Sequence, residues 1–273
     1  MKSISSKALA LCALFGCAAS AYAIPTLQVG APAGSGDVGL YADYKPTLSS
    51  PTESDTAVTS GNQILVGGAY SRGATELLIG GQYSGSAGTG LNWAQVLKAK
   101  FGGSLSDYAA FNGKGAILLA SVPNGAAGSL AVNGASAFFT SSTKSLFPNL
   151  HDPVKPDISD FLFFDIGNFA KTGTVPNFAD ETGGDVGQIK SLIIATSGFQ
   201  WVHFDVMALV TTKKKGGGTT TGLLTGLDNN PGSHDVTWKD SGGPPFGTPE
   251  PATPLLLGLG LMGLLMARRA RSK

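Results

Sequence analysis

Apolar and polar residues alternate in short segments along most of the chain, as in β-strands that bury one face. The pattern predicts strands over residues 63–70, 75–83, 115–122, 129–132, 135–140, 160–166, 188–196 and 199–211. Turn residues at 71–74 and 197–198 predict a hairpin at each of these positions. Only residues 91–101 space their apolar side chains at helical intervals. We therefore predict a mainly β fold, a β-sandwich or jelly-roll-like domain with one short helix.

Alternation along residues 199–211 assigns its side chains to two faces of one strand. One face is expected to carry Phe199, Trp201, His203, Asp205 and Met207, and the other Val202, Phe204 and Val206. His203 and Asp205 then share a face. The arrangement favours a buried pair that supports the sheet, because buried polar groups need partners.

Each of the three histidines has an aspartate nearby, in His151-Asp152, His203 with Asp205, and His234-Asp235. Imidazole and carboxylate are metal ligands, so His203, Asp205, His234 and Asp235 are also candidate ligands. However, the sequence contains no H-E-x-x-H motif, no dense Asp/Asn calcium loop and no histidines at fixed ligand spacing. A structural role is favoured over metal binding and catalysis, and no cofactor is predicted.

No segment carries a recognisable catalytic motif. Residues 85–88 have loop composition and do not form a nucleophile elbow, and Gly113-Lys114-Gly115 lacks the spacing of a phosphate loop. The tryptophans are expected to pack in the core more often than to stack on sugars. The lysine and glycine run over 213–222 is expected to form a solvated loop tip. We predict that the protein is not an enzyme.

Composition limits the functional classes further. The chain has 39 glycines, only 14% charged residues and a net charge of +1. This balance gives no reason to expect nucleic acid as a partner, because such partners attract basic proteins. It is typical of an exported, loop-rich β protein.

The first 23 residues have the features of a secretory signal peptide. Lys2 and Lys7 precede an apolar stretch over 8–18, and Ala21-Tyr22-Ala23 is a small-x-small cleavage site. The only cysteines, Cys12 and Cys17, lie inside this segment. Cleavage after Ala23 would therefore leave a mature chain without disulfides or reactive thiols. Lipidation at Cys17 is the alternative.

A second apolar segment covers residues 252–267, which carry no charge and are rich in leucine and glycine. Sixteen helical residues span about 24 Å, less than the hydrocarbon core of a membrane. Basic residues follow at once, namely Arg268, Arg269, Arg271 and Lys273, and can snorkel to headgroups on the cytoplasmic side. The segment is therefore predicted to be a marginal transmembrane helix. Pro249-Glu250-Pro251 before it should be stiff and extended.

Together, Pro249-Glu250-Pro251, the leucine and glycine run, and the arginines at 268, 269 and 271 resemble the PEP-CTERM protein-sorting signal. The resemblance implies processing by exosortase and delivery to the surface or matrix of a Gram-negative bacterium that makes exopolysaccharide. Residues 198–205 and 230–238 also resemble the choice-of-anchor class of surface proteins. That class implies no activity.

These observations predict a signal peptide at 1–23, a β-rich ectodomain at 24–240, a linker at 241–248 and a sorting signal at 249–273. The ectodomain is expected to be structural or adhesive. The expected partners are the general secretion machinery, exosortase, the inner membrane transiently, and extracellular polysaccharide. The alternatives are a secreted hydrolase or carbohydrate-binding protein, and a permanently membrane-anchored protein or lipoprotein.

Overall fold

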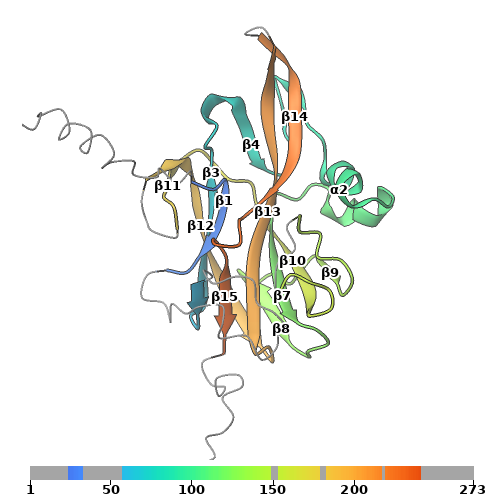
Figure 1. Cartoon of the computed structure of the whole chain (residues 1–273), viewed down its shortest axis with the longest axis vertical. Coiled ribbons are helices and arrows are strands. Elements are labelled where there is room, and N and C mark those ends of the chain that lie inside the picture. The colour runs from blue at the N-terminus through green and yellow to red at the C-terminus, as the bar shows by residue number, and fades with distance from the viewer. Residues whose placement is uncertain (1–23, 33–56, 149–152, 179–182, 217–218, 241–273) are drawn as a thin grey trace, which may run out of the picture.

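The structure, a computed structural model, describes residues 24–32, 57–148, 153–178, 183–216 and 219–240. Two sheets form most of this part of the chain (Figure 1), and all their strand pairs are antiparallel except β2 with β15, which is parallel. The smaller sheet has the order β1-β3-β12-β11, with β8 also paired to β12. The larger sheet has the order β2-β15-β13-β7-β10-β9, with β4 and β14 also paired to β13. The prediction of a mainly β, sandwich-like fold is confirmed.

The strands of the smaller sheet are β1 (Leu27–Gly30), β3 (Gln63–Ala69), β8 (Ser129–Val132), β11 (Gly173–Val175) and β12 (Asp185–Ser197). Those of the larger sheet are β2 (Ala57–Thr59), β4 (Glu76–Gly80), β7 (Ala116–Pro123), β9 (Phe139–Ser141), β10 (Ser159–Gly167), β13 (Trp201–Gly216), β14 (Thr219–Asn229) and β15 (Val236–Lys239). The short strands β5 (Ser84–Gly85) and β6 (Gly88–Thr89) pair with each other.

The main core lies between the two sheets. The side chains of Val202, Phe204 and Val206 on β13 pack there with Ile64 of β3 and Leu192 of β12. Both sheets contribute alternate residues, as expected where two sheets cover each other's apolar faces. Burial of this shared face is the main source of stability.

A second core covers the opposite face of the larger sheet. Helix α2 (Trp93–Phe101) and the 3-10 helix η3 (Ser106–Phe111) pack on this face with Met207 and Leu209 of β13. The remaining helix among the described residues is the 3-10 helix η2 (Gly73–Thr75). The helix at 91–101 is therefore confirmed, beginning two residues later than predicted. Asn92 caps it, because its side chain accepts the backbone N–H of Gln95 while the Gln95 side chain accepts the N–H of Asn92.

Both hairpin predictions are wrong, although the strands exist. β3 lies in the smaller sheet and the next long strand, β4, lies in the larger one. In the same way β12 and β13 lie in different sheets on either side of Gly198. Each pair contributes apolar side chains to the core between the sheets, such as Leu192 and Phe204. The chain therefore crosses between layers at these turns.

Other local expectations change in detail. Phe199 precedes β13 and packs in the core between the sheets, not on the face of His203, because the regular alternation of the strand begins only at Trp201. The strand predicted over 135–140 is shorter in the structure, where it covers Phe139–Ser141. The lysine run over 213–215 is part of β13 rather than of a loop, and its residues pair with β14.

None of the helices among the described residues is long and apolar enough to cross a membrane. The predicted signal and sorting helices lie outside those residues.

Candidate functional site

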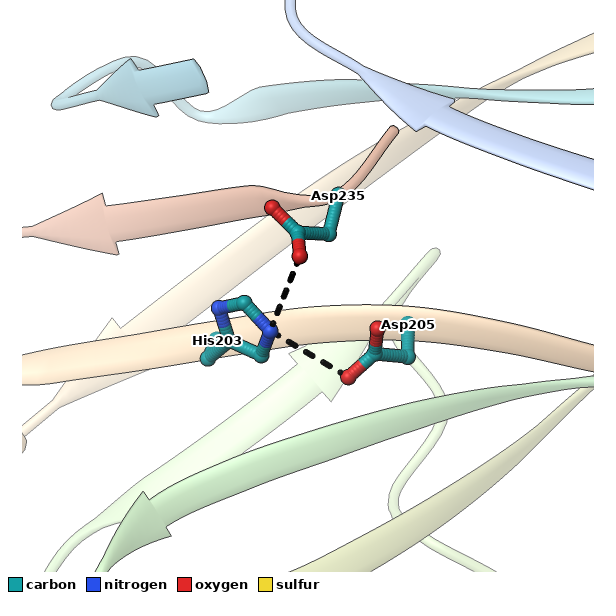
Figure 2. A group of neighbouring side chains, drawn as sticks. All are labelled: His203, Asp205 and Asp235. Atoms are coloured by element: carbon teal, nitrogen blue, oxygen red, sulfur yellow. Dashed lines mark ion pairs between the residues drawn. The ribbon is translucent and has the colours of Figure 1, made fainter. Parts of the chain in front are cut away.

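His203, Asp205 and Asp235 converge at one point on the larger sheet (Figure 2). His203 and Asp205 are two residues apart on β13 and therefore share a face, as the alternation predicted. Asp235 lies directly before β15, which pairs with β13. In Figure 2 both carboxylates point towards the same edge of the imidazole ring. All three side chains are fully buried.

The distances within this triad are short enough for direct interaction. His203 Nε2 is 3.3 Å from Asp205 Oδ2 and 3.6 Å from Asp235 Oδ2. One ligand-type atom from each residue lies within 4.8 Å of the other two. One imidazole nitrogen and two carboxylates are a donor set that first-row divalent cations accept.

Neighbouring side chains fix the orientation of the triad. His203 Nδ1 is 2.8 Å from Thr237 Oγ1, so the other ring nitrogen faces the carboxylates. Asn230 donates from Nδ2 to Asp205 Oδ1 over 3.0 Å and accepts the backbone N–H of Val206 over 2.7 Å. The Asn230 amide also donates to the carbonyl of His234. The site is thus preorganised by groups outside the triad.

The other sequence candidates separate from this cluster. His234 turns away from it and its Nε2 lies 2.6 Å from Asn177 Oδ1. Ser233 Oγ is 2.9 Å from the other ring nitrogen of His234. His234 closes a turn, in which its N–H donates to the carbonyl of Pro231, whereas Asp235 directly precedes β15, so Asp235 joins the triad and His234 does not. His151 and Asp152 lie outside the described residues.

Sequence reasoning missed the polar residues beside the triad, namely Asn230 and Thr237, which hold its side chains, and Ser121, which lies opposite His203. Two signals were available. Ser121 interrupts an otherwise apolar strand, and Thr237 lies two residues after Asp235, hence on the same face. The pairing of β7 and β15 with β13, which brings them together, depends on the fold.

The most specific functional feature lies outside the described residues. Residues 248–271 match the family model of the PEP-CTERM protein-sorting motif. The chain carries a PEP-CTERM sorting motif. This motif contains Pro249, Glu250, Pro251, Arg268, Arg269 and Arg271, and it marks exported proteins for processing by exosortase. No curated protein and no solved structure matches the chain.

Beyond the PEP-CTERM motif, two assignments stay predictions. Signal cleavage at Ala21 and Ala23 falls outside the described residues. The resemblance to the choice-of-anchor class over 198–205 and 230–238 is not shown by the comparisons. The structure places parts of both segments side by side, since β13 and β15 pair from Trp201 to Phe204.

Proposed function

We propose that the protein crosses the inner membrane through the general secretion machinery, is processed by exosortase at its PEP-CTERM motif and reaches the cell surface or exopolysaccharide matrix. There the β-sandwich acts as a structural or adhesive module and not as an enzyme. The observation that carries this proposal is the match of residues 248–271 to the sorting motif. The β-rich composition of the preceding part is consistent with an exported module.

Burial of the polar triad supports a non-enzymatic role. His203, Asp205 and Asp235 have no exposed side-chain surface. A catalytic group has to come within hydrogen-bond distance of its substrate. A hydrolase would therefore need this site to open, whereas a structural site is compatible with full burial.

An open cavity of about 550 Å³ supports the adhesive part of the proposal. Its lining combines hydroxyl groups, a carboxylate and two aromatic rings, from Thr140, Ser141, Ser142, Thr143, Asp160, Phe161 and Phe199 among others. Binding sites for small organic groups combine apolar walls with a few polar groups in this way. A short segment of polysaccharide is the ligand class that this lining favours.

The sorting step is tested on the full chain, expressed in an exosortase-positive Gram-negative host and in the matching exosortase-deficient strain. Mass spectrometry of the surface protein should find no peptide from residues 255–273 in the first strain. The unprocessed chain should accumulate in the second. Replacing Pro249 and Pro251 by alanine should also block processing, because the segment would lose its fixed extended conformation.

Arg268→Lys with Arg269→Lys is the matched control, because it keeps the positive charge and should be processed normally. A surface protein that retains residues 255–273 would instead identify a permanently anchored protein. A mature chain beginning at a lipidated Cys17 would identify a lipoprotein.

Binding is tested on arrays of extracellular polysaccharides. Thr140→Arg introduces a long side chain at the exposed rim of the cavity and should abolish binding. Thr174→Arg, on exposed β11 of the other sheet, is the control and should bind like the wild type. Equal binding by both variants would exclude this cavity, and hydrolysis of any glycan would favour the enzyme alternative.

A further inference from the structure

We propose that His203, Asp205 and Asp235 bind a divalent transition cation of the Zn²⁺ class as a structural metal centre within the larger sheet. The inference is independent of sorting and of polysaccharide binding. It rests on four observations: the ligand spacing, the strand register, the groups that orient the ligands, and a buried hydroxyl group beside them.

The spacing of the donor atoms fits ligands that share a metal ion. Ligand bonds of about 2.0–2.1 Å in a tetrahedral zinc site place donor atoms roughly 3.3 Å apart. His203 Nε2 lies 3.3 Å and 3.6 Å from the two aspartate oxygens. The two distances therefore fit three donor atoms that surround one ion.

The strand register brings two carboxylates together on a buried face. β13 and β15 pair with His203 opposite Thr237 and Phe204 opposite Val236. Continuing this register by one residue places Asp205 opposite Asp235. Like charges at directly opposed positions destabilise a sheet, and burial increases that cost. A divalent cation between the two carboxylates would convert the repulsion into attraction.

The surrounding hydrogen bonds prepare the donor atoms for a metal ion. Thr237 holds Nδ1 of His203 and thereby directs Nε2 towards the carboxylates. Asn230 holds Oδ1 of Asp205, which leaves Oδ2 as the oxygen nearest to the ring. Metal-binding histidines and carboxylates characteristically have such a partner on the atom that does not face the metal.

Ser121 provides an independent indication that this cluster binds a further group. It lies directly opposite His203 on β7 and therefore on the same face of the sheet. Its side chain is fully buried, and its Oγ forms no hydrogen bond with any residue that the structure describes. Buried hydroxyl groups are nearly always satisfied. We assign Ser121 to the fourth position of the centre, as a direct ligand or through a bound water molecule.

Full burial also indicates the type of site. Catalytic zinc centres keep one position open to water or substrate, whereas structural centres are closed. Every assigned side chain is buried, and together they connect β7, β13 and the start of β15. The metal would therefore stabilise the junction of three neighbouring strands.

The test is the metal content of the full chain, purified in detergent without chelators and measured by plasma mass spectrometry. One divalent transition ion per chain is expected, or one Zn²⁺ per chain after dialysis of chelator-treated protein against Zn²⁺. Co²⁺ in place of Zn²⁺ should give visible absorption bands with the intensity of a tetrahedral nitrogen and oxygen site. Wild-type protein that remains without stoichiometric metal under both conditions would overturn the proposal.

Matched variants separate ligands from neighbours. His203→Gln and Asp235→Asn should lose the metal. His234→Gln, which alters the adjacent histidine, and Asp165→Asn, which alters another carboxylate of the same sheet, should keep it. Full occupancy in Asp235→Asn would rule out the assigned ligand set.

A conservative variant keeps the test decisive if the ligand variants fail to fold. Thr237→Val preserves side-chain shape and removes only the group that orients His203. It should weaken Zn²⁺ binding by about 10–100-fold, the range seen when such supporting partners are removed. Unchanged affinity in folded Thr237→Val would contradict the assigned orientation of His203.

Ser121→Ala distinguishes a metal centre from a purely structural polar cluster. In a metal centre it should weaken Zn²⁺ binding and lower the thermal midpoint of the metal-bound protein. In a cluster without metal it should leave the midpoint unchanged or raise it, since it removes a buried hydroxyl without a partner. The second result would count against the proposal.

Discussion

Two ends of the same face of β13 are built on different principles. Further towards its C-terminal end, Met207 and Leu209 pack against α2 and η3 in a cluster of aliphatic and aromatic side chains. Towards its N-terminal end, the face carries His203 and Asp205, which are equally buried. The apolar end gains stability from area removed from water, without directional requirements. The polar end is stable only if every donor and acceptor is satisfied, which makes it sensitive to single atoms.

The largest expected effect lies at the apolar end. Phe111 of η3 is fully buried, and its ring contacts Phe163 of β10 edge-on at 5.5 Å between centroids. Phe111→Ala should lower the free energy of unfolding by about 3–5 kcal/mol, because it leaves a cavity between η3 and the sheet. Urea unfolding followed by tryptophan fluorescence measures this loss. Phe111→Leu, which retains most of the volume, should lose less than half as much.

A loss below about 1 kcal/mol in Phe111→Ala would mean that η3 contributes little packing to this face. The apolar end would then depend on the sheet alone. In that case the contrast between the two ends of β13 would no longer hold.

At the polar end, replacing Asn230 should also lower the free energy of unfolding, but through lost hydrogen bonds rather than through a cavity. Asn230 satisfies the N–H of Val206 and one oxygen of Asp205. Asn230→Ala leaves both groups buried without this partner, at a cost of about 1–3 kcal/mol for each buried group that loses its hydrogen bond. Asn230→Asp is the informative companion. It keeps an acceptor for Val206 but faces Asp205 with a second carboxylate, so it should be at least as harmful.

Urea titrations of both Asn230 variants measure this effect. Hydrogen exchange at Val206 should increase in both variants, but in Asn230→Asp by no more than the loss of global stability accounts for. Equal stability of Asn230→Ala and the wild type would show that water replaces the amide. The polar end would then be less specific than the geometry indicates.

The two ends also differ in how far the sequence predicts them. Alternation along β13 correctly assigned His203 and Asp205 to one face, because it follows from strand geometry alone. It could not place Asp235 beside them, because the neighbour of β13 is decided by sheet order. The same limit explains the two wrong hairpins. Turn composition at Gly198 shows that the chain changes direction, but not whether it returns in the same sheet or crosses to the other.

The sorting motif illustrates the opposite case. Its information lies in the order of residues along the chain, and the match over 248–271 needs no contact between distant segments. A peptide motif is therefore readable from the sequence, whereas a site assembled from β7, β13 and β15 is not. This is why the sorting motif could be predicted more fully than the role of the ectodomain.

The smallest expected effect tests whether a buried carboxylate outside the triad behaves differently from the pair at the polar end. Glu76 lies opposite Thr212 near the other end of β13, and its side chain is buried. Burial raises the pKa of Glu76 above its ordinary value of 4.5, and the charge of Asp228 adds to the shift, although the N–H of Arg72 and the charges of Arg72 and Lys171 oppose it. The folded state therefore holds this proton more tightly than the unfolded state does. Ionisation of Glu76 reduces stability as the pH rises through its raised pKa.

Glu76→Gln removes that ionisation and keeps an oxygen that can accept the Arg72 N–H. The variant should exceed the wild type in urea midpoint at pH 7, by a modest amount, and the difference should disappear below pH 4.5. Asp107→Asn is the control of opposite sign. Hydrogen bonds from Ser104, first from its backbone N–H, lower the pKa of Asp107, so this variant should be less stable than the wild type at pH 7 and converge with it in acid. If Glu76→Gln is instead less stable at pH 7, the charge interactions of Glu76 with Arg72 and Lys171 outweigh burial, and a buried carboxylate outside the triad needs no proton or cation.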